Sequence, residues 1–301
     1  NRIRDEPNDG GTHMRFAAYS QNGTHGIAVA ENAHTAFHAC PSTDANYPGS
    51  LTSLVAAGPD KLMSAGRAML AGPEIDLDSV TLLPPLPTPP KIICVGLNYA
   101  DHSAESGFAE APSYPTLFGR FASSLIGAGA PIIRPRLSEQ LDYEGEIVAV
   151  IGKSGRDISR ENALDHVVAY SLFNDASIRE YQFKAPQWTV GKNFDGTGPF
   201  GPYLVTADEL PPGIAGLKLT TTLNGEVVQE GATDDLVFDV VTLIHTISQA
   251  ISLEAGDIIV TGTPSGVGMA RKPPLWMKPG DVVEVTVPGI GTLRNPVAAQ
   301  A

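Results

Sequence analysis

The chain has 301 residues, which is enough for one large domain or for a large domain and a small one. With 42% hydrophobic and 18% charged residues it has the composition of a globular protein, and no apolar run reaches the roughly 18–20 residues of a membrane span. The net charge of −13 repels phosphate backbones, so we expect neither nucleic acid nor a membrane as a partner. An anionic substrate would need positive charge supplied locally.

The first ninety residues predict a small N-terminal unit. Residues 1–13 are polar, and we expect a disordered or added extension there. Residues 14–82 combine two short strand-like runs with a helical stretch near 50–71, and they form the expected small domain. Residues 83–90 include five prolines, which neither a helix nor a central strand accommodates, so an extended linker is predicted.

The rest of the chain, 91–299, predicts a larger unit of the α+β class that is mainly β. Its expected strands lie at 91–96, 143–152, 169–173, 217–223, 226–229, 258–261 and 281–287. Asn224-Gly225 between two alternating runs indicates a type I′ hairpin. Apolar residues at helical spacing predict an amphipathic helix over 240–251, and a shorter helix is expected at 159–168. Strands outnumber helices and form hairpins, which favours an antiparallel architecture.

Two glutamates stand at one end of an apolar strand. Side chains alternate along a strand, so Glu144 and Glu146 share a face that continues as Val148 and Val150. Two like charges beside an apolar face are costly unless a cation neutralises them. Oxygen ligands favour Mg²⁺, Mn²⁺ or Ca²⁺. The pattern on its own is also that of a solvated strand end.

A third acid, Asp175, ends the next apolar strand. Arg179 and Gln182 follow four and seven positions later, which is the spacing of one helical face. A guanidinium group is well matched to a carboxylate, so we interpret Arg179 as facing a substrate, although a solvated surface cation has the same spacing.

A polar segment around residues 98–107 contains a possible acid–base pair. His102 and Glu105 are three residues apart, so in a helix the carboxylate could orient the imidazole. A single surface histidine is the plainer interpretation of these two residues alone. The two cysteines, Cys40 and Cys94, match no metal or redox spacing, and we expect free thiols in a cytoplasmic protein.

Taken in order, these segments resemble the fumarylacetoacetate hydrolase family, in particular its acylpyruvase-like branch. The segments that carry the resemblance are Lys91–Gly96 with Asn98–His102, Tyr143–Glu146, Asn174-Asp175, Trp188–Lys192, Asn224–Glu226 and Gly256–Gly268. The resemblance implies a mixed β-sandwich or β-roll catalytic domain, a small N-terminal domain, a homodimer and a Mg²⁺ or Mn²⁺ site.

The resemblance also implies roles for particular residues. Metal ligands fall on Glu144, Glu146 and Asp175. The remaining roles are a catalytic pair at His102 and Glu105, a catalytic lysine at Lys192, and substrate contacts at Arg179, Gln182 and Thr263. Relatives often have a lysine in a Phe-Leu-Lys-Pro segment where this chain reads Leu117-Phe-Gly-Arg120. Arg120 is therefore expected to replace that lysine as a substrate-binding residue.

These residues predict a metal-dependent hydrolase that cleaves a carbon–carbon bond in a 2,4-dioxo acid of the acylpyruvate or fumarylpyruvate type. The metal would act as a Lewis acid, His102 would activate water, and Lys192 and Arg179 would stabilise negative charge. Two alternatives use the same enolate: decarboxylation of oxaloacetate, and isomerisation or hydration of a 2-oxo-enoic acid. A non-catalytic binding protein is the remaining class.

Overall fold

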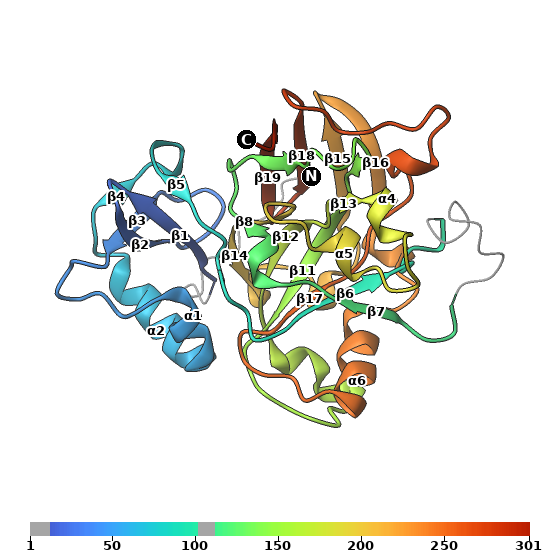
Figure 1. Cartoon of the computed structure of the whole chain (residues 1–301). Coiled ribbons are helices and arrows are strands. Elements are labelled where there is room, and N and C mark those ends of the chain that lie inside the picture. The colour runs from blue at the N-terminus through green and yellow to red at the C-terminus, as the bar shows by residue number, and fades with distance from the viewer. Residues whose placement is uncertain (1–12, 102–111) are drawn as a thin grey trace, which may run out of the picture.

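The computed structural model describes residues 13–101 and 112–301. Figure 1 shows a smaller N-terminal lobe, in which two helices lie below a group of strands, beside a larger body of strands. The helices are α1 (Leu51–Ala56), α2 (Pro59–Met69), α4 (Arg179–Gln182), α5 (Thr189–Lys192) and α6 (Val240–Ala250).

A 12-stranded sheet runs through both lobes. In spatial order its main strands are β4 (Glu74–Ile75), β3 (Phe37–Pro41), β2 (Thr24–Ala30), β1 (Arg15–Gln21), β14 (Gly198–Thr206), β12 (Val167–Asn174), β11 (Gly145–Ile151), β17 (Ile258–Val260), β6 (Ile92–Gly96) and β7 (Thr116–Gly119). Two short strands lie off this path: β5 (Thr81–Leu82) pairs with β1, and β8 (Leu125–Ile126) pairs with β14.

A second sheet of five strands belongs to the larger body. Its order is β16 (Glu226–Ala232), β15 (Lys218–Leu223), β18 (Val282–Val287), β19 (Gly291–Ala299) and β9 (Ile132–Arg134). A two-stranded ribbon, β10 (Leu141–Asp142) with β13 (Ser177–Ile178), completes the β structure of the described residues. Most pairings are antiparallel, as the sequence predicts, and the fold is mainly β with a few helices.

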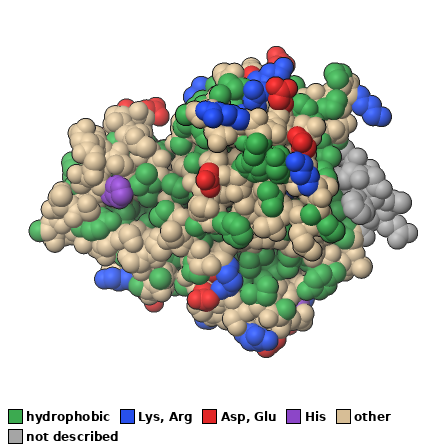
Figure 2. Space-filling view, viewed as in Figure 1, with side chains coloured by type: hydrophobic (Ala, Val, Ile, Leu, Met, Phe, Trp, Pro, Cys, Tyr) green, Lys and Arg blue, Asp and Glu red, His purple; other side chains and the backbone are tan. Residues whose placement is uncertain are grey.

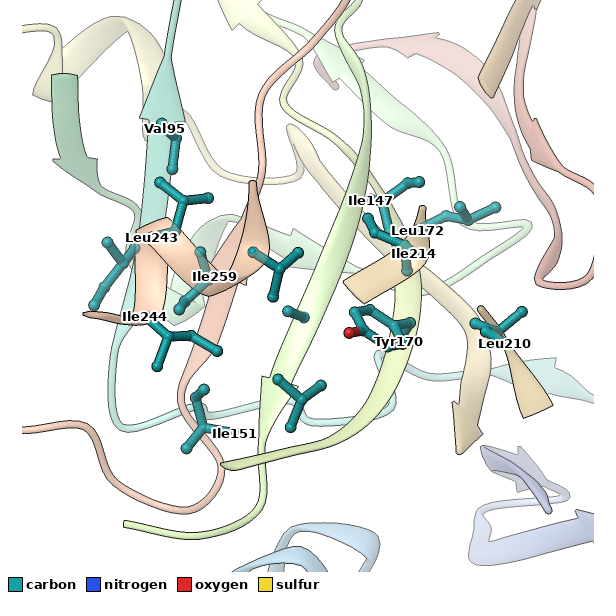
Figure 3. Close-up of a cluster of buried hydrophobic side chains, with 14 of the residues drawn as sticks. Val95, Ile147, Ile151, Tyr170, Leu172, Leu210, Ile214, Leu243, Ile244 and Ile259 are labelled. Atoms are coloured by element: carbon teal, nitrogen blue, oxygen red, sulfur yellow. The ribbon is translucent and has the colours of Figure 1, made fainter. Parts of the chain in front are cut away.

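The central strand β11 has apolar residues on both faces. Ile147, Ala149 and Ile151 belong to one buried cluster, whereas Val148 and Val150 belong to another. Figure 3 shows the first cluster, in which Leu243 and Ile244 of α6 lie against Ile259 of β17. The second cluster joins the other face of the sheet to α1 and α2. Both faces of β11 are thus covered, which makes charged side chains at its end unusual.

Several local predictions are confirmed by the structure. Residues Asn224 and Gly225 connect β15 to β16, and both have the positive φ values, 53° and 84°, that a type I′ turn requires. The amphipathic helix is α6, and the Asp239 side chain caps it by accepting from the Thr242 N–H. The helix expected at 159–168 is instead a 3₁₀ helix, Arg160–His166.

The N-terminal lobe shares the sheet of the larger body, because β1 pairs with β14. The predicted linker at 83–90 has neither helix nor strand, and Leu86 within it is fully buried. The division of the chain at this linker therefore stays a prediction. Both cysteines are free and buried, as expected.

No helix among the described residues is long and apolar enough to cross a membrane. On the face shown in Figure 2, acidic and basic side chains are interspersed.

We expect Ile244→Ala to lower the free energy of unfolding by about 2–5 kcal/mol, because it removes a fully buried side chain and leaves a cavity between α6 and the sheet. Ile251→Ala is the matched control, since Ile251 ends the same helix with 41% of its surface exposed and should change the stability by less than about 1 kcal/mol. Urea unfolding of both variants measures the difference. Equal losses would contradict the packing described for α6.

Candidate metal centre

The three acids predicted as metal ligands meet where two neighbouring strands end. Glu146 lies in β11, Glu144 directly precedes that strand, and Asp175 directly follows β12. The two strands are antiparallel with Gly145 opposite Asn174, so the start of one lies beside the end of the other. The Asp175 N–H donates to the Glu144 carbonyl at 2.9 Å, which fixes the two acids against each other.

The geometry of these three side chains fits a divalent cation. Each offers a carboxylate oxygen, all within 4.8 Å of one another, and the residues are 5%, 2% and 0% exposed. Three carboxylates in so small a buried volume repel each other strongly without positive charge between them. A set made only of carboxylate oxygens is the donor set that hard cations such as Mg²⁺ and Mn²⁺ prefer.

Two basic residues already lie against this cluster. The Lys192 ammonium group donates to Glu144 Oε2 at 2.7 Å and to Asp175 Oδ2 at 2.6 Å. Arg179 Nη2 is 2.6 Å from Glu144 Oε1. Burial alone would lower the pKa of Lys192, but the charges of Asp175 and Glu144 outweigh it and raise that pKa above 10.5. The lysine is therefore a cation at neutral pH.

Glu146 has a different environment from the other two acids. It accepts a hydrogen bond from the Gly262 N–H at 2.6 Å, but within residues 13–101 and 112–301 no basic side chain forms an ion pair with it. Burial, together with the charges of Asp175 and Glu144, raises the pKa of Glu146 well above 4.5. A carboxylate in this position still needs a cation, and a metal bound by the three acids would supply it.

Gly262 must be glycine for this contact to form. Its φ of 104° lies in the left-handed region, which disfavours residues with a side chain. An added Cβ would also stand 2.7 Å from the Asn98 Cβ. Close backbone approach is thus what lets the loop after β17 donate an N–H to Glu146.

A cavity of about 260 Å³ opens directly above the acids. Its polar floor contains Glu144, Glu146, Arg179, Gln182, Lys192 and Thr263, and its apolar walls contain Val95, Leu97, Phe118, Phe183, Trp188 and Met269. The structure therefore brings together the three predicted ligands, the predicted lysine and three of the four predicted substrate residues. The combination of a charged floor and apolar walls suits a small anion held away from water.

Arg179 and Gln182 reach the cavity by a route that differs from the helical register expected from the sequence. The helix begins only at Arg179, so Asp175 lies outside it and the expected common helical face is wrong. Arg179 instead donates to Asp142 Oδ2 at 2.8 Å and to Gln182 Oε1 at 2.8 Å. Arg179 and Gln182 share the short helix α4, whereas Asp175 lies outside it, directly after β12.

Arg120, the fourth residue predicted to bind substrate, does not line this cavity. Its side chain is fully buried behind Asp175, and Nη1 donates to Asp175 Oδ1 at 2.5 Å. The position of Arg120 therefore does not support the predicted contact with a substrate in the cavity. Its partner Asp175 stands between the guanidinium group and the predicted metal position.

Two buried polar residues of the site are absent from the sequence predictions. Asp142 accepts from Arg179 and from the N–H groups of Gly268 and Met269, so it ties the loop beside the cavity to Arg179. Gln229 donates to the Thr263 hydroxyl at 2.8 Å. Asp142 lies two residues before Glu144, so the same two-residue spacing that relates Glu144 to Glu146 marks it in the sequence. Gln229 lies in β16, and no local signal marks it.

His102 and Glu105 lie outside the described residues, so their catalytic roles stay predictions. The residues just before them do reach the site: Asn98 is fully buried, and its Nδ2 donates to the Thr261 carbonyl at 2.7 Å.

The fold and the buried carboxylate cluster define a class of protein, an enzyme whose catalytic domain provides carboxylates for a divalent metal. Residues 91–298 match the family described as fumarylacetoacetate (FAA) hydrolase C-terminal. The chain therefore belongs to the fumarylacetoacetate hydrolase family.

Named relatives have similar sequences over most of the chain. The oxaloacetate tautomerase YisK of Bacillus subtilis is 41% identical over 83% of this chain and 87% of its own length. The human mitochondrial oxaloacetate tautomerase FAHD2A is 39% identical over 84% of this chain and 81% of its own length.

Solved structures of the family have the same fold. A fumarylacetoacetate hydrolase from Exiguobacterium antarcticum superposes with a TM-score of 0.82 at 40% identity, covering 95% of this chain and all of that one. A maleylpyruvate hydrolase from Sphingobium, in complex with manganese and pyruvate, superposes with a TM-score of 0.78 at 26% identity, with the same coverage of both chains.

Replacing one acid should weaken metal binding while the chain stays folded. Loss of a residue that hydrogen-bonds to a metal ligand typically weakens metal binding by roughly 10- to 100-fold. We expect Glu146→Gln, which alters a ligand itself, to raise the Kd for Mn²⁺ by more than that. Glu139→Gln is the control, because Glu139 has 86% of its side chain exposed and should leave the Kd unchanged. Isothermal titration of the metal-free protein measures both constants. An unchanged Kd in the first variant would remove Glu146 from the set of ligands.

Proposed function

We propose that this chain is a metal-dependent enzyme that interconverts the enol and keto forms of oxaloacetate or of a closely similar 2-oxo acid. The observation that carries the proposal is the cavity whose floor combines Glu144 and Glu146 with Lys192, Arg179 and Gln182. The buried carboxylate of Asp175 completes the acidic cluster without lining the cavity. The names of relatives about 40% identical over more than four fifths of the chain support oxaloacetate as the substrate.

The residues in the cavity suit this chemistry. When bound by Glu144, Glu146 and Asp175, a Mg²⁺ or Mn²⁺ ion would supply Lewis-acid stabilisation of negative charge on a 2-oxo oxygen. Arg179 and Gln182 offer hydrogen-bond donors for a substrate carboxylate. Lys192 holds a positive charge at the same floor, where it can stabilise an enolate oxygen.

In the proposed reaction the enol O–H proton leaves oxygen and a proton is added at carbon 3, so that no water is consumed. The apolar walls formed by Phe118, Trp188 and Val95 would limit the access of water, which could otherwise exchange with these protons. His102, oriented by Glu105, remains the predicted proton carrier. Tautomerisation asks this pair only to transfer protons. Hydrolysis would also require a water molecule to attack the distal carbonyl of the substrate.

Hydrolysis of an acylpyruvate, the first prediction from the sequence, has weaker support than an oxaloacetate reaction. The relative named for hydrolysis of an acylpyruvate is the maleylpyruvate hydrolase, at 26% identity. A relative named fumarylacetoacetate hydrolase is 40% identical, and the oxaloacetate tautomerases are 39–41% identical. We keep hydrolysis as the second candidate because the predicted triad, lysine and His–Glu pair would serve it equally. Oxaloacetate decarboxylation would release pyruvate as well, and this property separates both from tautomerisation.

Homodimer formation and a cytoplasmic location also stay proposals. The names of the relatives include a mitochondrial human protein and a bacterial one, so they support neither compartment in particular.

The assignment is tested by adding the purified enzyme with Mg²⁺ to freshly dissolved enol oxaloacetate. We expect the enol absorbance to fall faster than in buffer while no pyruvate forms, and EDTA to abolish the acceleration. Pyruvate is measured in the same sample with lactate dehydrogenase. Stoichiometric pyruvate would instead identify the decarboxylase, and pyruvate released only from an acylpyruvate panel would identify the hydrolase.

Lys192→Met should lower kcat by about 10²–10³-fold, the loss typical of removing one donor aimed at developing charge. Lys184→Met is the matched control, because Lys184 is half exposed and lies away from the cavity floor. Initial rates of enol loss at saturating substrate measure both variants. Equal rates for the two variants would exclude Lys192 from the chemistry.

His102→Ala distinguishes the reactions in a second way. The variant should lose most activity if proton transfer to carbon or activation of water limits the rate, and it should retain most activity if the enzyme only decarboxylates. Rates of enol loss and of pyruvate release, measured side by side, give the answer.

A further inference from the structure

Arg120 occupies a fully buried position with a partner for each of its nitrogens. Nη1 donates to Asp175 Oδ1 at 2.5 Å and to the Ala176 carbonyl at 3.2 Å. Nη2 donates to the Thr197 hydroxyl at 2.9 Å, and Nε to the Ser124 hydroxyl at 3.3 Å. The guanidinium group is thus fixed by three separate segments of the chain.

The hydroxyl groups that hold Arg120 are themselves fixed. Thr197 Oγ1 donates to the Phe194 carbonyl at 2.6 Å, and Ser124 Oγ donates to the Phe121 carbonyl at 2.8 Å. The guanidinium carbon also lies 5.6 Å from the centre of the Phe173 ring. These contacts leave the guanidinium plane with one orientation, so the position of its Nη1 is fixed as well.

The two oxygens of Asp175 therefore have different partners. Oδ1 accepts from Arg120, which lies outside the cavity, whereas Oδ2 accepts from Lys192, which lines it. Asp175 is 0% exposed, so both hydrogen bonds lie away from bulk solvent. Rotation of the carboxylate would break a buried, charge-assisted hydrogen bond.

We propose that Arg120 is a positioning residue for the metal centre. It holds Asp175 Oδ1 in a hydrogen bond, which would leave Oδ2 for a metal bound by the three acids, and its charge offsets part of the charge of those acids. This inference rests on the metal site of the proposed function, but it does not depend on which 2-oxo acid reacts. It assigns Arg120 a role other than the substrate contact expected from the sequence.

The charges near the site are consistent with this role. Four buried carboxylates, those of Asp142, Glu144, Glu146 and Asp175, are adjacent there. The basic side chains that pair with them in the described part of the chain are Arg120, Arg179 and Lys192. Arg120 is the one of these three that contacts a metal ligand without lining the cavity, so it can act on the metal but not directly on the substrate.

The test uses the full chain, freed of metal and titrated with Mn²⁺ by calorimetry and by electron paramagnetic resonance. We expect Arg120→Met to raise the Mn²⁺ Kd by about 10- to 100-fold, the range found for outer partners of metal ligands. Arg120→Lys, which restores the charge but cannot hold Asp175 and Thr197 together, should recover part of the affinity. Arg156→Met is the control, because the Arg156 side chain is 57% exposed and contacts Asp157 and the Gln249 carbonyl, neither of which belongs to the site.

Circular dichroism melting without metal shows whether each variant is folded. A folded Arg120→Met variant with the wild-type Mn²⁺ affinity would overturn the proposal, and so would Met and Lys variants that are equally weak. If the Met variant does not fold, the Lys variant decides: weaker binding supports the role, and an unchanged Kd overturns it. A wild-type protein that binds Mn²⁺ but does not act on oxaloacetate would refute the proposed substrate and leave the role of Arg120 intact.

Discussion

The structure of this site depends on the cost of burying several carboxylates side by side. Asp142, Glu144, Glu146 and Asp175 are each at most 5% exposed. Removing a single charge from water costs several kcal/mol even after relaxation, so four neighbouring anions require cations at defined positions. Much of the local structure provides those cations: α4 begins with Arg179, α5 ends with Lys192, and Arg120 follows β7 directly. The remaining deficit of positive charge falls at Glu146, where a metal would bind.

Strand pairing explains how the acids come together. Asp142 ends β10, Glu144 lies between the strands and Glu146 lies in β11, so the three acids occupy every second position. The antiparallel register of β11 with β12 and the hydrogen bond from the Asp175 N–H to the Glu144 carbonyl bring Asp175 beside the two glutamates. A shift of that register by one residue would point the acids of one strand away from the other. The apolar residues that continue both faces of β11 fix the register, so the core that stabilises the fold also sets the geometry of the site.

Features governed by local patterns could be predicted from the sequence. The Asn224-Gly225 turn and α6 follow from turn chemistry and helical periodicity, and the pairing of two glutamates follows from strand alternation. Contacts between distant segments could not be predicted in the same way. The partner of Arg120 is 55 residues away, and nothing near Arg120 in the sequence indicates that it faces Asp175 rather than a substrate. The helical spacing predicts one common face for Asp175, Arg179 and Gln182, but α4 begins only at Arg179, so it holds for the last two residues and not for Asp175.

The site as described would support several reactions, because tautomerisation, decarboxylation and hydrolysis of 2-oxo acids share an enolate that needs the same stabilisation. Glu144, Glu146, Asp175 and Lys192 belong to that shared step, so their geometry cannot favour one reaction over another. The reactions differ in what they require beyond the enolate: a proton delivered to carbon, the departure of carbon dioxide, or an activated water. The apolar walls around the charged floor would shield the enolate from bulk water in each of the three reactions, so the wall residues do not separate them either. The choice of reaction therefore depends on the group that moves the proton or activates the water, which is the role predicted for His102 and Glu105.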